Sequence, residues 1–239
     1  RMASSVYKRV LLKLSGQSFC KPGEFGVDGE ELDSLAEKIK QLYELDVEIA
    51  IVVGGGNFLR GATFSQESHI PRNTADYMGM LATILNACAL QETLEANNRP
   101  TRVLSAIEVS AICEKFIRRR AFRHLERGRV IILAGGTGNP FFTTDTCAAL
   151  RAAELEADVL IKATKVAGVY DKDPETEADA KLYDKLSYEQ VIRKNLKVMD
   201  QTAFSLCRDN KIPITVLNIF EEDNLVKAAR GENVGTMVS

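Results

Sequence analysis

The chain has no tryptophan, only two histidines, and no two of its five cysteines at Cys-x-x-Cys spacing. With so few clustered donors, a Cys/His zinc site is not expected. The odd number of cysteines also argues against a framework of disulfides. We therefore expect reduced, mostly buried thiols at Cys20, Cys88, Cys113, Cys147 and Cys207.

An excess of charge of one sign and a long apolar run are also missing. Lys plus Arg number 31 and Asp plus Glu 33, so the net charge of −2 argues against a nucleic-acid or anionic-membrane surface spread over the molecule. No stretch approaches the ~18 consecutive apolar residues of a membrane span. Residues 2–9 lack an apolar core of signal-peptide length. We expect a cytoplasmic protein without nucleic-acid or membrane partners.

Short apolar runs alternate with longer amphipathic ones along the chain. The short runs predict strands at 7–14, 47–53, 102–104, 130–133, 159–161 and 214–217. Apolar residues spaced by three and four predict helices at about 28–42, 73–97, 105–127, 144–157, 187–210 and 223–230. Strands that alternate with long helices indicate a mostly parallel sheet covered on both faces. The fold class is therefore α/β, and the lack of a Pro/Ser-rich linker predicts one domain over residues 1–239.

A glycine triplet at 54–56 directly follows a predicted strand. Its N–H groups could line an anion-binding nest, and Arg60 could direct a guanidinium at the same anion. The alternative is a tight turn with Arg60 in solvent. The spacing from Gly56 to Gly61 matches a P-loop, but Ala62 stands where the phosphate-binding lysine is required. The dinucleotide fingerprint fails at this turn and at the second glycine turn described next.

The second glycine-rich turn, residues 135–144, also ends a predicted strand and opens a predicted helix. It offers backbone N–H groups, hydroxyls and an aromatic pair, which suits a phosphorylated ligand that carries a ring. Helix capping alone would explain Thr144 and Asp145. Phe141 and Phe142 could be core residues.

Two lysine-bearing segments also lie at strand ends. Lys13 stands inside the first apolar strand, where its charge is costly unless paired. It is either an edge residue that reaches water or a phosphate-facing residue at the carboxyl end of the sheet. Residues 162–170 follow another strand. Ligands bind at the carboxyl ends of such strands, so four polar turns there indicate one site for a small ligand.

Five ordered segments carry a resemblance to a known family. They are YKRVLLKLSG (7–16), GGGNFLRG (54–61), TGNPFFTTD (137–145), KATKVAGVY (162–170) and LKVMD (196–200). Together they resemble the bacterial type of uridylate (UMP) kinase, in the amino-acid-kinase superfamily, from residue 7 to about 237. The resemblance implies a three-layer α/β/α sandwich, a homohexamer, and transfer of the ATP γ-phosphoryl group to UMP in pyrimidine nucleotide biosynthesis. The N-terminal part would mainly hold UMP and the C-terminal part mainly ATP.

The resemblance also implies roles for individual residues. The ATP contacts would be Lys13, Leu14, Ser15, Gly16, Gly56, Arg60, Thr164, Tyr170 and Asp173. The UMP contacts would be Gly55, Asp76, Thr137, Gly138, Asn139, Pro140, Phe141, Phe142, Thr143 and Thr144. The catalytic residues would be Lys13, Arg60, Asp145 and Lys162. Mg²⁺ would arrive with ATP, and no side chain is assigned as a metal ligand.

Two features of the predicted helix at 73–97 carry further expectations. It holds more apolar residues than one helix face needs, so we expect part of it at a subunit interface. Asp76, near its start, would either complement the helix dipole or, by the resemblance, accept hydrogen bonds from the UMP ribose.

The residue types fit this chemistry without a general base. The phosphate of a nucleoside monophosphate has a second pKa of about 6 and is ionised near neutral pH. His69, in a polar loop, and His124, in a basic helix, need no catalytic role. A carboxylate kinase would have no reason for residues 137–144, and the failed fingerprints disfavour a nicotinamide oxidoreductase. A nucleotide sensor would share the site, but retention of Lys13, Arg60 and Asp145 favours an enzyme.

Overall fold

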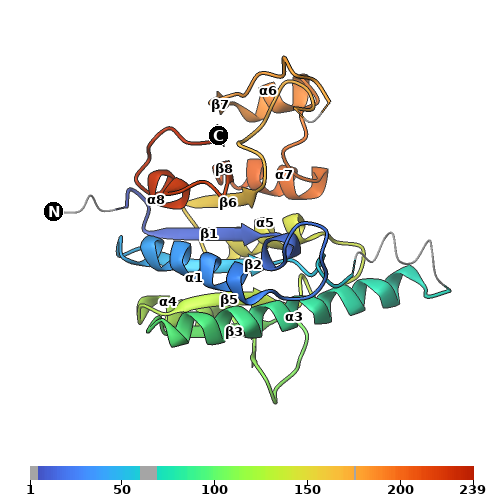
Figure 1. The fold of residues 1–239 in the computed structure, drawn as a ribbon, viewed down its shortest axis with the longest axis vertical. Coiled ribbons are helices and arrows are strands. Elements are labelled where there is room, and N and C mark those ends of the chain that lie inside the picture. The colour runs from blue at the N-terminus through green and yellow to red at the C-terminus, as the bar shows by residue number, and fades with distance from the viewer. Residues whose placement is uncertain (1–4, 60–68, 175) are drawn as a thin grey trace.

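Nine strands form one sheet in the part of the chain that the computed structural model describes, residues 5–59, 69–174 and 176–239. The order is β4-β3-β5-β2-β1-β6-β8-β9-β7, and every pair is parallel except β8 with β9 (Figure 1). The strands are β1 Arg9–Leu14, β2 Glu48–Val53, β3 Thr101–Ser105, β4 Glu114–Lys115, β5 Val130–Ala134, β6 Val159–Thr164, β7 Lys185–Leu186, β8 Ile214–Asn218 and β9 Thr236–Val238. The predicted mainly parallel α/β sheet is confirmed.

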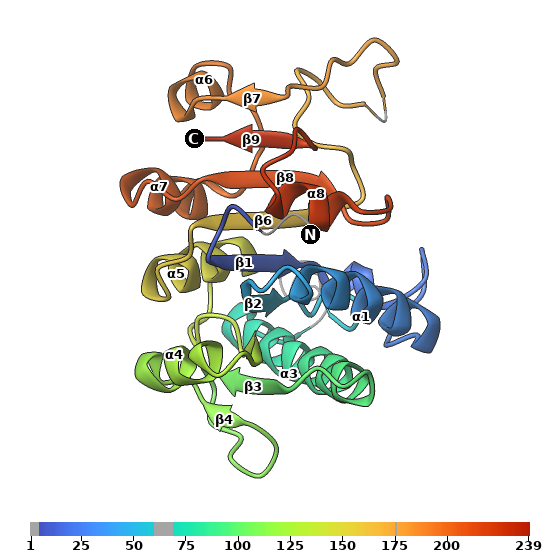
Figure 2. The same cartoon turned by 90° about the vertical axis from the view of Figure 1, so that its left-hand side faces the viewer.

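Helices cover both faces of this sheet. They are α1 Gly29–Tyr43, α3 Arg72–Ala96, α4 Arg118–Glu126, α5 Thr144–Glu154, α6 Tyr188–Arg193, α7 Gln201–Asp209 and α8 Asn224–Ala229, with a 3₁₀ turn at Gly16–Phe19. Figure 2 shows α1, α3 and α8 on one side and α4, α5 and α7 on the other. Each side has its own buried apolar cluster, so the molecule is a three-layer sandwich.

The alternation of side chains along β1 decides which layer each residue meets. Val10, Leu12 and Leu14 pack into the cluster on the α1 and α3 side. Leu11 packs into the cluster on the α5 side, and Lys13 shares its face of the strand. Lys13 therefore points toward α5.

Two of the predicted helices are wrong in part. Of 105–127, only the α4 region is helical, because residues 114–115 pair with the free edge of β3 and Phe116 donates its N–H to the Ser105 carbonyl. The 187–210 region is two helices, α6 and α7. Asn195, with φ of 51°, follows α6, and the Asp200 side chain caps α7 by accepting the Ala203 N–H.

The sheet brings the four polar turns to one edge. β5, β2, β1 and β6 are adjacent and parallel, so their carboxyl ends lie side by side. The N-terminal end of α3 projects past these strand ends (Figure 1). The polar turns predicted at strand ends therefore lie together on the carboxyl edge, which is where ligands bind in sheets of this kind.

The cysteines and histidines differ in how deeply they are buried. The five thiols are free; Cys20, Cys147 and Cys207 are buried, and the other two are partly exposed. Burial raises the pKa of Cys147 to about 11 and that of Cys207 to about 12, so both stay protonated at neutral pH. His124 is buried with Nε2 3.1 Å from Glu114, and His69 is exposed. Within the described ranges, no helix has the length and apolar character needed to span a membrane.

Candidate active site

Lys13 and Lys162 meet on one carboxylate at the centre of the carboxyl edge. Lys13 Nζ lies 2.9 Å from Asp145 Oδ1, and Lys162 Nζ donates a hydrogen bond of 2.7 Å to Oδ2. Lys13 is 9% exposed and lies on β1, which has neighbours on both sides, so its interpretation as an edge residue is wrong. Lys162 also donates to the Val198 carbonyl at 2.8 Å. The structure thus brings three of the four predicted catalytic residues together, and Arg60 lies outside the described residues.

Asp145 belongs to the first turn of α5. The capping residue is Thr143, whose hydroxyl accepts the Thr146 N–H at 3.1 Å, and not Thr144 or Asp145. Burial raises the pKa of Asp145, but the ammonium groups of Lys13 and Lys162 outweigh burial and lower the pKa below its usual value. Asp145 is therefore an anion at neutral pH that holds two cations beside the N-terminus of a helix.

The first glycine turn packs directly against α3. A Cβ on Gly55 would lie 2.6 Å from the Gly79 carbonyl oxygen and 2.9 Å from Ala82 Cβ, so any side chain there would force the turn off the helix. On its other side, Gly54 donates its N–H to the Leu14 carbonyl at 2.9 Å. The turn is held between the end of β1 and α3.

The second glycine turn is also fixed to α3. The Gly135 N–H donates to the hydroxyl of Thr83, a buried residue of α3, at 2.8 Å. Between the two turns lies a pocket of about 330 Å³, within the range typical of small-ligand sites. Its lining residues are Gly55, Gly56, Leu59, Arg72, Asp76, Gly79, Met80, Thr83, Gly136, Thr137, Asn139, Phe142, Thr143 and Thr144. Most of the predicted UMP contacts line this one pocket, which we call the acceptor pocket.

Asp76 stands at the mouth of the acceptor pocket with two partners. Arg72 Nε donates to both carboxylate oxygens, at 2.8 and 2.9 Å, and the Phe141 N–H donates to Oδ2 at 2.8 Å. The Arg72 guanidinium also lies 5.8 Å from the centre of the Phe141 ring. Asp76 therefore ties the second glycine-rich turn to α3, a role that goes beyond complementing the helix dipole.

Phe141 and Phe142 are not core residues, in contrast to one interpretation of the sequence. They are 67% and 52% exposed. Phe141 has φ of 70°, a left-handed conformation that is costly for an aromatic residue and is often found at functional sites. The Asp76 carboxylate holds its N–H in this conformation. Phe142 lines the acceptor pocket, and the exposed Phe141 ring lies against Arg72, which also lines it.

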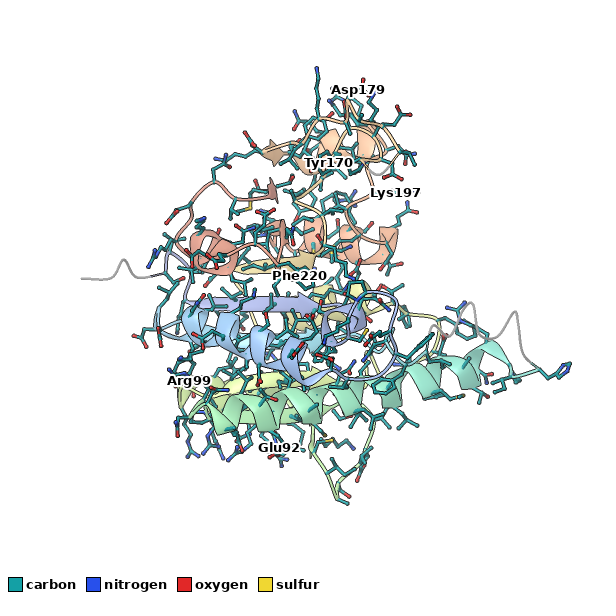
Figure 3. The ribbon with its side chains drawn as sticks, viewed as in Figure 1. Glu92, Arg99, Tyr170, Asp179, Lys197 and Phe220 are labelled. Atoms are coloured by element: carbon teal, nitrogen blue, oxygen red, sulfur yellow. The ribbon has the colours of Figure 1, made fainter. Side chains whose placement is uncertain are left out.

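A second pocket, of about 400 Å³, lies beyond β6 on the other side of the lysines. Tyr170 and Asp173, two of the predicted ATP contacts, line it together with Lys197. Figure 3 shows Tyr170 and Lys197 in the part of the molecule near α6. Thr164, also a predicted ATP contact, is not among the residues that line this pocket. Its hydroxyl donates to the Val166 carbonyl at 2.8 Å and shapes the turn after β6. We call this second cavity the nucleoside pocket.

The end of β1 lies between the two pockets in the sheet order. Leu14 is a core residue whose carbonyl receives the Gly54 N–H, and the Ser15 hydroxyl lies 3.4 Å from that of Ser18. Gly16 packs against the backbone of Gly56. Gly138 and Pro140 belong to the second turn, where the Gly138 N–H donates to the Gly135 carbonyl. The predicted phosphate contacts thus stand between the predicted acceptor and nucleoside contacts.

Some site residues were not predicted from the sequence. Arg72, Gly79 and Thr83 line the acceptor pocket from α3. Asp200 accepts hydrogen bonds from the Thr143 and Thr146 hydroxyls and so links the start of α5 to α7. Residues 72, 76, 79 and 83 are spaced by three and four in the sequence, which places them on one face of a helix beside the glycine turns. That spacing was the sequence signal that could have identified them as site residues.

A doubly covered parallel sheet, with glycine turns and a Lys–Asp–Lys group at its carboxyl edge, defines the class of this protein as an α/β fold with a candidate small-ligand site at that edge. More particularly, the chain belongs to the amino acid kinase family, whose family model matches residues 8–218. It is a kinase of that family.

Solved structures of UMP kinases are similar over nearly the whole chain. The crystal structure of UMP kinase from Bacillus anthracis is 39% identical, with a TM-score of 0.94 and coverage of 98% of this chain and 96% of that one. UMP kinase from Ureaplasma parvum is 37% identical, with a TM-score of 0.91 and coverage of 97% and 98%. Uridylate kinase from Archaeoglobus fulgidus is 28% identical, with a TM-score of 0.73 and coverage of 96% and 99%.

Proposed function

We propose that the chain transfers the γ-phosphoryl group of ATP to UMP, giving UDP and ADP in pyrimidine nucleotide biosynthesis. The observation that carries the proposal is the position of the Lys–Asp–Lys group between two pockets, in a chain similar to two bacterial UMP kinases over nearly its full length. The substrates are cytoplasmic metabolites, so we place the enzyme in the cytoplasm.

UMP is assigned to the acceptor pocket. Its base and ribose would lie along residues 137–142 and Asp76, and its phosphate would point toward the glycine turns and the N-terminus of α5. Backbone N–H groups at a helix start favour an anion. Thr143 and Thr144 line the pocket at that point. Gly55 would let the phosphate approach the backbone closely.

ATP is assigned to the other side of the lysines. Tyr170 and Asp173 would hold the nucleoside in the nucleoside pocket. Lys13, Ser15, Gly16 and Gly56 would receive the phosphates at the end of β1. Arg60 is proposed beside them from the resemblance alone. The γ-phosphoryl group would then lie over β1, where the acceptor phosphate can reach it.

The chemistry that this geometry favours is positioning and neutralisation of charge. The acceptor oxygen is already ionised near neutral pH, so proton removal is not required. Charge spreads over the equatorial oxygens in the transition state, and preorganised cations stabilise it. Lys13 and Lys162 would supply that charge, and Asp145 would hold both ammonium groups in place before the nucleotides bind.

A magnesium ion would travel with ATP and add positive charge at its phosphates. Mg²⁺ is usually held by one or two carboxylates together with substrate phosphates. Both oxygens of Asp145 already contact lysines, which fits an ion held mainly by the nucleotide.

We also propose self-association to a homohexamer through α3. Tyr77, Met78, Leu81 and Leu85 are exposed large apolar residues on one side of this helix. Exposed apolar patches of this kind mark protein interfaces. A second copy of the chain would cover them while the opposite face of α3 lines the acceptor pocket.

One assay tests the function directly. Phosphoryl transfer from ATP is measured with UMP, CMP, dUMP, aspartate and glutamate as acceptors, and UMP should be the preferred one. Preference for aspartate or glutamate would make the chain a carboxylate kinase. Tight nucleotide binding without product would make it a sensor.

A further inference from the structure

Two asparagines that face one another behind the first glycine turn are fully buried. Asn57 Nδ2 donates to Asn86 Oδ1 at 2.9 Å, and Asn86 Nδ2 donates to Asn57 Oδ1 at 2.7 Å. The remaining N–H of each amide goes to backbone, from Asn86 to the Gly54 carbonyl at 2.7 Å and from Asn57 to the Gly26 carbonyl at 2.6 Å. Every donor of this pair is used.

The pair joins the glycine turn to its surroundings. Asn86 is in the middle of α3, and Asn57 directly follows Gly56. A Cβ on Gly16 would lie 2.7 Å from Asn57 Oδ1 and 2.8 Å from its N atom, so the end of β1 rests on Asn57 itself. The pair therefore lies between α3, which lines the acceptor pocket, and the residues proposed to hold the ATP phosphates.

In-line phosphoryl transfer depends on where this pair holds the residues around it. Acceptor and donor phosphates must meet in one geometry, and a misplacement of 1 Å can cost about 10²-fold in rate. Asn57 and Gly54 are at the two ends of the turn, and Asn86 bonds to both. Among the residues that the structure describes, Asn86 is the side chain of α3 that forms hydrogen bonds to this turn.

We propose that Asn86 is a positioning residue for phosphoryl transfer, which acts through Asn57 to hold the first glycine turn in place against the end of β1. This inference rests on the proposed function. A buried polar pair can also serve stability alone, because unsatisfied amides in a low-dielectric core are costly. The two roles differ in what they change. Loss of stability reduces the folded fraction, whereas displacement of the first glycine turn from the end of β1 reduces kcat of the folded enzyme.

The test compares three variants with wild type. Asn86→Ala should lower kcat at saturating ATP and UMP by about tenfold to a hundredfold. The Kd for each nucleotide, measured calorimetrically, should change much less. Asn57→Ala should give the same defect, and the double variant should be no worse than either single one, because the pair acts as a unit. Leu90→Ala, at a fully buried apolar position of α3, is the control: it should lose stability but keep kcat per folded molecule.

The outcomes separate this inference from the proposed function. A wild-type kcat in folded Asn86→Ala or Asn57→Ala would overturn it, as would a kcat loss in Leu90→Ala of the same size. Asn57→Ala decides the matter if Asn86→Ala fails to fold. If wild type does not phosphorylate UMP, the proposed function is wrong, and the variants are compared on the acceptor that wild type does use.

Discussion

Lys13 and Lys162 occupy directly paired positions on the neighbouring strands β1 and β6, and both ammonium groups contact the carboxylate of Asp145. Two like charges on adjacent strands repel each other unless an anion lies between them. Asp145 supplies that anion from the first turn of α5. The three residues form a group with a net charge of about +1 at the carboxyl edge of the sheet.

Lys13→Ala should lower turnover by about 10²-fold or more, in line with the ~3–4 kcal/mol lost with one preorganised electrostatic donor. The protein should still fold, because Asp145 keeps Lys162 as a partner. Steady-state rates with saturating ATP and UMP check this. Lys8→Ala, an exposed lysine just before the amino end of β1, is the control and should keep wild-type turnover. Near-normal turnover of Lys13→Ala would remove it from the site.

Asp145→Asn should destabilise the protein most at neutral pH. Burial raises the pKa of Asp145 and the two lysines lower it further than burial raises it, so the folded pKa lies below the unfolded value. The stability that the carboxylate contributes is therefore present above the unfolded pKa of about 3.9 and is lost as the pH falls through the folded pKa. Breaking a buried ion pair typically costs about 3–5 kcal/mol.

Urea unfolding of wild type and Asp145→Asn at several pH values measures this effect. The difference in free energy of unfolding should be largest near pH 7 and should shrink below about pH 4. A difference that stays constant down to pH 3 would show that the stability from Asp145 does not depend on its charge.

The layers of the fold, and the grouping of the polar turns at one edge of the sheet, were predictable because they depend on local pattern. Apolar runs predicted the central strands, and the polar segments at their ends predicted the carboxyl edge. Lys13 was ambiguous from sequence alone, since the sheet order decides whether β1 is central. The apolar pattern of 105–127 predicted a helix, but a free strand edge at β3 gave residues 114–115 a better backbone partner.

The contacts made by α3 could not be predicted. Thr83 and Asn86 are ordinary polar residues in a helix by sequence, and their partners are backbone groups about 30 to 50 residues away. By sequence, Gly79 is an interior glycine that only weakens the helical pattern of residues 73–97. The reason for a glycine at this position is the pocket beside it, and that pocket forms only when the two glycine turns pack on α3.

Gly79→Ala should stabilise α3 and weaken binding of UMP. A Cβ at this position would meet no described atom within 4 Å, and Gly79 lines the acceptor pocket. Replacing an interior helix glycine should stabilise by up to about 1 kcal/mol. The added methyl group would occupy space in the pocket proposed for UMP, so the KM for UMP should rise while that for ATP stays unchanged.

Thermal unfolding and two-substrate kinetics check this prediction together. Gly29→Ala is a matched control, because a Cβ there also meets nothing within 4 Å but Gly29 begins α1, away from the pocket. An unchanged KM for UMP in Gly79→Ala would mean that the ligand does not approach this part of α3.

Leu81→Glu should disrupt self-association. Leu81 is 50% exposed at the centre of the apolar side of α3, and a charge there would be buried without a partner in an interface. Light scattering at micromolar concentration should give a multiple of the chain mass for wild type and a smaller mass for the variant. Glu92→Gln, an exposed position later on the helix, is the control. A monomeric wild type would contradict the proposed hexamer.

Asp76→Asn should weaken recognition of the ribose. A carboxylate beside an anionic substrate is favourable only if it accepts hydrogen bonds, and a charge-assisted bond is worth about 1.5–3 kcal/mol. Asn can still accept the Phe141 N–H, but it loses the ion pair with Arg72. The KM for UMP should rise about tenfold or more, the KM for ATP should barely change, and the preference for UMP over dUMP should shrink.

Arg72→Gln removes the same ion pair and keeps the carboxylate, so it should retain more of that preference. If Asp76→Asn keeps the wild-type KM values and UMP/dUMP ratio, the carboxylate only orders Phe141 and Arg72 and does not touch the acceptor.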